Sequence, residues 1–326
     1  MKIFNFTRPS HVIIGIHGLK NKPPRRLLRR WWIASIQEGL RDSGFPERDF
    51  RFELVYWANH LYSKPLSPRE KREGHPLFLE EPYAPAEDGV LVQDKKKRSF
   101  FLRPLFKKTL NKVFMSTRTA DEAEKIADKV LEHTFPDLVL YYDNEHVFHS
   151  RLGIQELLRG VLKKTLCKYS DSKIMLIAHS MGSIISFDVL SVSPVEVAVF
   201  VTIGSPLGLP FVRKRFAEEH MMKFSELDRI AVPNPITERW VNIADTKDVV
   251  AFDSSLADNY SENMHGIAVE DLVTANNCIS NGKPDHHSVY GYLRCREMAA
   301  IINQFLSTQH YTITEKIHLW WRKRFE

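Results

Sequence analysis

The chain contains little cysteine and no long hydrophobic run, and both shortages narrow the class of protein. It has only three cysteines, Cys167, Cys278 and Cys295. They show neither CxxC spacing nor a zinc-binding pattern, and an odd number argues against a disulfide framework and fits a reducing compartment. The first residues lack the apolar run of a signal peptide, and no stretch is long enough for a transmembrane helix. We therefore expect a cytoplasmic protein that is at most peripherally bound to a membrane.

The overall composition is that of a soluble globular protein. Hydrophobic residues make up 43% of the 326 residues and charged residues 26%. The length suits roughly two domains, or one large core with an insertion. The formal net charge of +6 is compatible with an anionic partner, but it does not choose among a membrane, a nucleic acid and an anionic substrate.

Residues 173–185 combine a buried strand, a sharp turn and the start of a helix. Ser180 stands at the turn, between an apolar run and a helical pattern. A serine at such a turn has a strained backbone and needs small neighbours, which Ala178 and Gly182 provide. The N–H groups of the following helix would face the serine and favour an oxyanion there. The pattern predicts a nucleophile; the alternative is a buried serine in an ordinary strand-to-helix turn.

The pentapeptide Ala178-His179-Ser180-Met181-Gly182 resembles the nucleophile elbow of the α/β-hydrolases. Alanine replaces the first glycine of the usual G-x-S-x-G, a variant found among lipases. The resemblance covers residues 10–60 and 137–310. It implies an α/β-hydrolase fold, with a mostly parallel central sheet and helices on both faces, and a serine hydrolase similar to lipases and esterases.

The resemblance also implies an oxyanion hole. A β-branched run at 12–16, expected to be a buried strand, ends in His17-Gly18-Leu19. In lipases that resemble this chain, a His-Gly pair after the first core strand opens the oxyanion loop. The backbone N–H groups of Leu19 and Met181 are then the implied oxyanion donors. The alternative for Gly18 is a plain glycine at the end of a strand.

The same family places the catalytic acid after a later strand, here expected at 240–244. The pattern Asn-x-x-Asp-x-x-Asp-x-Val is matched by Asn242, Asp245, Asp248 and Val250. The resemblance implies that Asp248 is the acid. Asp245 is the alternative, although an aspartate at that position readily caps a turn by bonding its own backbone.

The histidine should lie beyond the acid, because the order Ser, Asp, His is that of this fold. His287 precedes Ser288 and resembles the His-Ser-x-Tyr arrangement of these enzymes, directly before a helix expected to continue through Phe305. His286 remains an alternative base. A Gly-Ser-Pro-Leu turn at 204–207, which recurs at this place in lipase-like hydrolases, is expected to form a wall of the acyl pocket.

The expected domain organisation is a hydrolase core of residues 1–61 and 137–310, a helical cap or lid at 62–136, and a basic, aromatic tail at 311–326. Prolines make the first part of the insertion irregular, and amphipathic helices are expected after Pro104 and from Thr119. Residues 95–114 interleave lysines and arginines with aromatic and aliphatic residues. This stretch would either dock on an anionic membrane surface or pack its apolar face on the core.

These residues predict an enzyme that cleaves a carboxylic ester, lipase/esterase-like or phospholipase-like, through Ser180, His287 and Asp248. The expected partner is an acyl ester or lipid substrate, and no metal or cofactor is needed. A thioesterase or acyltransferase could use the same triad. A non-catalytic membrane-binding scaffold on a hydrolase fold is a further alternative. A nucleic-acid binder is the least favoured, because the basic stretch contains no recognisable nucleic-acid motif.

Overall fold

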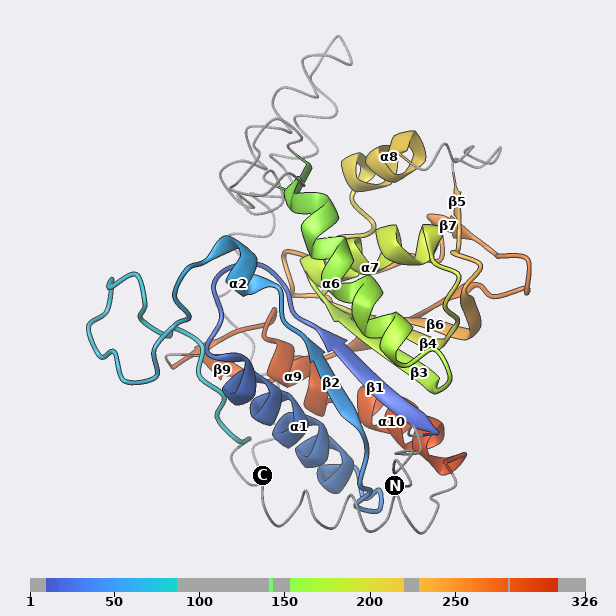
Figure 1. Ribbon diagram of the computed structural model, residues 1–326. Helices are drawn as coiled ribbons and strands as arrows, with labels where there is room; N and C mark the ends of the chain where they lie inside the picture. The colour runs from blue at the N-terminus through green and yellow to red at the C-terminus, as the bar shows by residue number, and fades with distance from the viewer. Residues whose placement is uncertain are drawn as a thin grey trace, which may run out of the picture.

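A parallel sheet lies at the centre of the protein (Figure 1). The computed structural model describes residues 10–86, 141–142, 153–219, 229–251, 253–280 and 282–309. The sheet has six strands in the order β2-β1-β3-β4-β6-β8, and every neighbouring pair is parallel. The strands are β1 (His11–Ile16), β2 (Phe52–Val55), β3 (Lys173–His179), β4 (Val197–Ile203), β6 (Ile236–Asp245) and β8 (Val269–Thr274). The expected α/β class is confirmed.

Helices cover both faces of this sheet (Figure 1). One face carries α6 (Ile154–Lys168), α7 (Met181–Val192) and α8 (Pro210–Glu219). The other carries α1 (Arg25–Asp42), α9 (Val289–Arg294) and α10 (Arg296–Ser307). Successive side chains of a strand alternate between the two faces, so Val12 and Ile14 join one hydrophobic core and Ile13 joins the other. Burial on both faces explains why the central strands are almost continuously apolar.

The smaller elements lie around the sheet. The short helix α2 (Ala58–Leu61) follows β2. The two-residue strands β5 (Ile230–Ala231) and β7 (Tyr260–Ser261) pair in parallel, and β9 (Ile279–Ser280) and β10 (Lys283–Pro284) form an antiparallel pair. The last pair lies in the connection from β8 to α9, the segment that contains the two candidate histidines.

The helix expected through Phe305 is in fact two helices, which is a correction to the sequence analysis. The helical conformation is interrupted at Cys295, whose backbone is extended, with ψ at 155°. The sulfur of the buried Cys295 side chain accepts the N–H of Met298 at 3.5 Å, so it caps the N-terminus of α10. Just before the break, Gly39 of α1 packs on the backbone of Arg294, where a Cβ would lie 2.7 Å from the Arg294 Cα.

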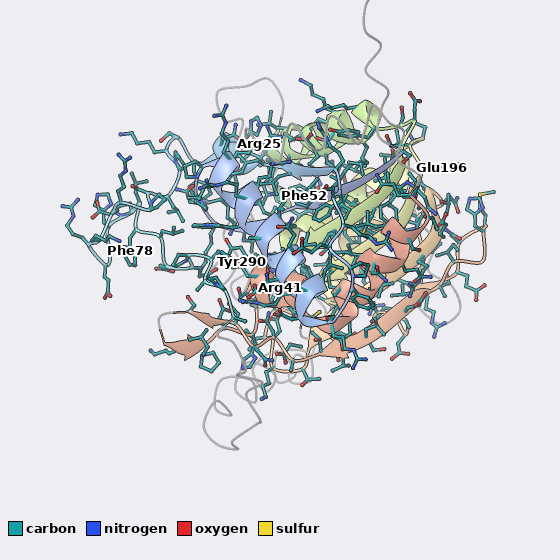
Figure 2. The ribbon with its side chains drawn as sticks, turned by 90° about the horizontal axis from the view of Figure 1, so that it is seen from below. Arg25, Arg41, Phe52, Phe78, Glu196 and Tyr290 are labelled. Atoms are coloured by element: carbon teal, nitrogen blue, oxygen red, sulfur yellow. The ribbon has the colours of Figure 1, made fainter. Side chains whose placement is uncertain are left out.

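Residues 62–86, the described part of the expected insertion, are irregular apart from one bridge between Ser67 and Phe78. In Figure 2, Phe78 lies on an outlying loop, whereas Tyr290 lies against α1. The segment returns to the core at Tyr83, whose hydroxyl donates to Glu38 Oε2 at 3.1 Å and whose ring meets Tyr290 edge-on. The remaining insertion, with both helices expected there, and the tail at 311–326 lie outside the described residues. Within the described part of the chain, no helix has the length and apolar character needed to cross a membrane.

Candidate active site

Ser180 occupies the turn between β3 and α7 in a backbone conformation that is rare for a residue with a side chain. Its φ is 53° and its ψ is −128°, and α7 begins at the next residue. Such a conformation persists only where the surroundings enforce it. The surroundings of this turn are tightly packed: a Cβ at Gly182 would lie 2.8 Å from the carbonyl oxygen of Ile16 and 2.9 Å from that of His17. The end of β1 is therefore packed directly against the first turn of α7.

Hydrogen bonds hold the strained turn in place. The N–H of Ser180 donates to the carbonyl of Ile203, the last residue of β4, at 3.1 Å. The carbonyl of Ser180 accepts the hydroxyl of Ser183 at 2.6 Å, and the hydroxyls of Ser183 and Ser205 are 2.8 Å apart. The serines at 183 and 205 thus connect the turn to the loop that follows β4.

The loop after β1 passes directly over Ser180. A Cβ on Gly18 would lie 2.7 Å from the Ser180 Cβ, so only glycine fits there. His17 fixes the conformation of this loop: its Nε2 accepts the N–H of Trp57 at 3.1 Å, which places its proton on Nδ1, and Nδ1 donates to the carbonyl of Gly18 at 2.8 Å. Burial and, after it, the Lys22 charge lower the pKa of His17 to about 3, so the ring is neutral.

The anchored carbonyl of Gly18 also orients the Leu19 N–H. The two groups belong to one planar trans peptide and point in opposite directions, so the N–H of Leu19 is turned away from the His17 ring. Met181 is the first residue of α7, and the N–H groups of a first helical turn have no partner within the helix. The two N–H groups expected from the sequence are therefore a loop amide next to Gly18 and a helix N-terminal amide next to Ser180.

Asp248 and His287 form a hydrogen-bonded pair, with 2.8 Å between Asp248 Oδ2 and His287 Nδ1. Asp248 follows β6 and is buried, and its Oδ1 accepts the N–H of Val250 at 2.8 Å. Burial alone would raise the pKa of Asp248, but the His287 charge and the hydrogen bonds to the carboxylate outweigh it and lower that pKa. Conversely, burial would lower the pKa of His287, but the Asp248 charge and hydrogen bond raise it above its ordinary value.

The loop after β4 brings this pair next to Ser180. Gly204 has a φ of +53°, and a Cβ there would lie 2.9 Å from Asp248 Oδ2 and 3.0 Å from His287 Nδ1. It directly follows Ile203, whose carbonyl holds the Ser180 N–H. From the other side, His179 Nε2 donates to the carbonyl of His287 at 2.9 Å, and the two rings are 4.7 Å apart. Ser180, Asp248 and His287 thus gather at the carboxyl ends of β3, β4 and β6.

The two alternatives from the sequence form a second pair. His286 Nδ1 and Asp245 Oδ2 are 2.9 Å apart, and the Asp245 carboxylate also accepts the N–H groups of Lys247 at 2.7 Å and Asn276 at 2.9 Å. Asp245, the last residue of β6, therefore caps the turn that follows it, as expected from the sequence. The structure pairs Asp248 with His287 and Asp245 with His286.

Tyr292, Asn276 and Gly204 are residues of this region that the sequence analysis did not place at the acid–histidine pair. Tyr292 donates its hydroxyl to Asp248 Oδ2 at 2.8 Å. Asn276 Nδ2 donates to the carbonyl of Ser288 at 2.8 Å, which ties the β8 side of the connection to the histidine segment. Gly204 was expected only in a pocket wall. In sequence, Tyr292 is indistinguishable from any core tyrosine of an apolar helix, so no local signal could have identified it.

Within the described ranges, no group of three or more histidine, cysteine, aspartate or glutamate side chains is arranged to hold a metal ion. No protein-family model matches this sequence. Nor is any curated protein detectably similar to it in sequence.

Proposed function

We propose that this protein is a serine hydrolase of the α/β-hydrolase fold that cleaves carboxylic esters, in the manner of lipases, esterases or phospholipases. One observation supports this more than any other: strained Ser180 lies at the same end of the parallel sheet as buried Asp248 and its hydrogen-bonded partner, the half-buried His287. In open α/β sheets, the carboxyl ends of the strands are where ligands bind. In this proposal, residues 62–136 form a cap over a core of 1–61 and 137–310.

The acyl-transfer step follows from these roles. The Ser180 hydroxyl attacks the ester carbonyl carbon while His287 Nε2 takes its proton, and a tetrahedral oxyanion forms. The N–H groups of Leu19 and Met181 would stabilise the oxyanion. When the oxyanion collapses, the bond to the alcohol oxygen breaks, His287 returns the proton to that oxygen, and an acyl-serine remains. Water, deprotonated by His287, then releases the acid and regenerates Ser180.

The hydrogen bond to Asp248 determines which nitrogen of His287 carries the proton. Because Nδ1 carries the proton that Asp248 accepts, Nε2 is the nitrogen that presents a lone pair to the serine. The Asp248 carboxylate also stabilises the imidazolium that forms when His287 takes the proton. The same charge raises the pKa of His287 above its ordinary value, so the proposed base keeps its proton to a higher pH than an unperturbed histidine does.

A fluorophosphonate probe and a short nitrophenyl ester test the proposal. We expect the wild type to be labelled and to hydrolyse the ester, and Ser180→Ala to be unlabelled with kcat lower by at least about a thousandfold. Ser191→Ala is a matched control, because Ser191 lies near the other end of the same helix and its hydroxyl donates to the carbonyl of Phe187 within that helix. Ester hydrolysis at the wild-type rate by a clean preparation of Ser180→Ala would overturn the mechanism.

A further inference from the structure

The hydroxyl of Tyr292 lies between the two aspartates of the site. Tyr292 is buried on α9, and its oxygen is 2.9 Å from the N–H of Asp245 and 2.8 Å from Asp248 Oδ2. The direction of both bonds is determined, because a backbone N–H can only donate. The hydroxyl therefore accepts from Asp245 and must direct its own proton to the Asp248 carboxylate.

The geometry points to Tyr292 as a positioning residue that limits how strongly Asp248 acts on His287. This inference rests on the proposed function, in which His287 is the base. Tyr292 and His287 donate to the same oxygen, Oδ2, each at 2.8 Å. The other oxygen, Oδ1, accepts the N–H groups of Val250 at 2.8 Å and Ala251 at 3.4 Å. The negative charge that His287 meets is therefore shared with a neutral donor.

Removal of the hydroxyl has a predictable sign. With one donor fewer on Oδ2, the carboxylate would interact more strongly with the His287 imidazolium, and in a buried site this interaction is little screened. The pKa of His287 should then rise further. A base with a higher pKa is protonated over a wider pH range, so activity would be lost at a higher pH as the solution is acidified.

The other ionisable groups that act on His287 come from three parts of the chain. Asp285 belongs to the same segment as His287, Glu81 to residues 62–86, and His179 to the end of β3. Tyrosine-to-phenylalanine exchange at 292 changes none of them. The ring of Tyr292 belongs to the hydrophobic core beneath α1 and α10, and phenylalanine retains that packing.

Tyr169→Phe is a matched control. The Tyr169 hydroxyl is also buried and also donates to a carboxylate, Glu53 Oε2, at 2.8 Å. Tyr169 lies just before β3 begins, whereas Ser180 follows the end of that strand. The two variants therefore remove the same kind of hydrogen bond at opposite ends of the parallel sheet, one before β3 begins and one after β6 ends.

The experiment measures kcat/KM for a short soluble ester across pH, together with the titration of His287 by NMR of ring-labelled histidine. For Tyr292→Phe we expect the acid limb and the His287 pKa to move upward by roughly 0.5 pH unit, which lowers kcat/KM about threefold on that limb. Tyr169→Phe should leave both unchanged. The thermal midpoint shows that each variant is folded, and Tyr292→Met provides a second hydroxyl-free variant should Tyr292→Phe not fold.

Two results would overturn the inference. One is a folded Tyr292→Phe with an unchanged or downward-shifted acid limb and His287 titration. The other is an equal loss of kcat at every pH, which indicates a merely structural role. A wild type that neither hydrolyses esters nor reacts with the fluorophosphonate would instead overturn the proposed function, and the NMR titration would still decide whether Tyr292 controls His287.

Discussion

Replacement of Asp248 by asparagine is the sharpest perturbation of the proposed site, because every polar neighbour of this carboxylate is a donor. His287 and Tyr292 donate to Oδ2, and the backbone N–H groups of Val250 and Ala251 donate to Oδ1. An amide has only one oxygen to offer. Its NH2 group must therefore face donors on one side or the other.

The two orientations of the new side chain have different consequences. With the NH2 group toward Val250 and Ala251, buried N–H groups lose their acceptor, at about 1–3 kcal/mol for each unsatisfied group. With the NH2 group toward His287, Nδ1 must accept instead of donate, so the ring proton moves to Nε2. Nε2 then has no lone pair to take the Ser180 proton. Loss of this tautomer costs about 10⁴ in kcat in a well-studied triad, or about 5.4 kcal/mol of barrier.

Asp245→Asn is the matched comparison. Asp245 also accepts backbone N–H groups, from Lys247 and Asn276, but its histidine partner is His286. We expect the two variants to lose similar amounts of thermal stability, and only Asp248→Asn to lose kcat by thousands-fold in the nitrophenyl ester assay. The reasoning is refuted if Asp245→Asn is the more damaging to kcat, or if Asp248→Asn stays within tenfold of the wild type.

Three further predictions concern other parts of the chain. His287→Ala should abolish ester hydrolysis and His286→Ala should reduce it far less; the reverse result would move the base by one residue. Because the pKa of His17 is about 3 in the folded protein, the unfolded chain binds an extra proton between about pH 3 and 6.5. The free energy of unfolding should therefore fall with decreasing pH across that window, by up to about 1.4 kcal/mol per pH unit. Denaturant titrations at a series of pH values should show a weaker dependence of this free energy on pH for His17→Asn than for the wild type. Exchange of the basic residues at 95–98 for glutamate should weaken sedimentation with anionic vesicles and hydrolysis of vesicle substrate while leaving a soluble ester nearly unaffected; equal vesicle binding by wild type and variant at low salt would contradict this.

Three strands of the sheet, β1, β3 and β6, could be predicted because buried strands need apolar residues. β8 was not predicted, and most of its side chains are half-buried or exposed. β1 and β3 are buried on both faces, which requires the apolar runs from which they were predicted. The break at Cys295 could not be predicted, because its causes are the approach of Gly39 from α1 and a thiol cap in the place of the usual serine, threonine, aspartate or asparagine.

The strained turn at Ser180 was also accessible from sequence, since it depends on near neighbours in the chain. A strand, a serine and a helix within residues 173–185, with a glycine at 182, suffice to predict a residue with unusual backbone angles. What the glycine makes room for is a tertiary fact: the carbonyl groups at the end of β1. The glycine is therefore visible in the local sequence, but the reason that it is needed is a contact with a distant strand.

The sequence by itself determined the α/β class, the position of the serine, and a short set of candidates consisting of two aspartates and two adjacent histidines. Only the tertiary structure decided how these candidates pair, with Asp248 on His287 and Asp245 on His286. The physical reason is that a hydrogen bond requires its donor and acceptor to be placed to within a few tenths of an ångström, and here they come from segments about 40 residues apart. Those distances are set by the ends of β6, by the link from Asn276 to Ser288, and by Tyr292 on α9, none of which a local pattern can position.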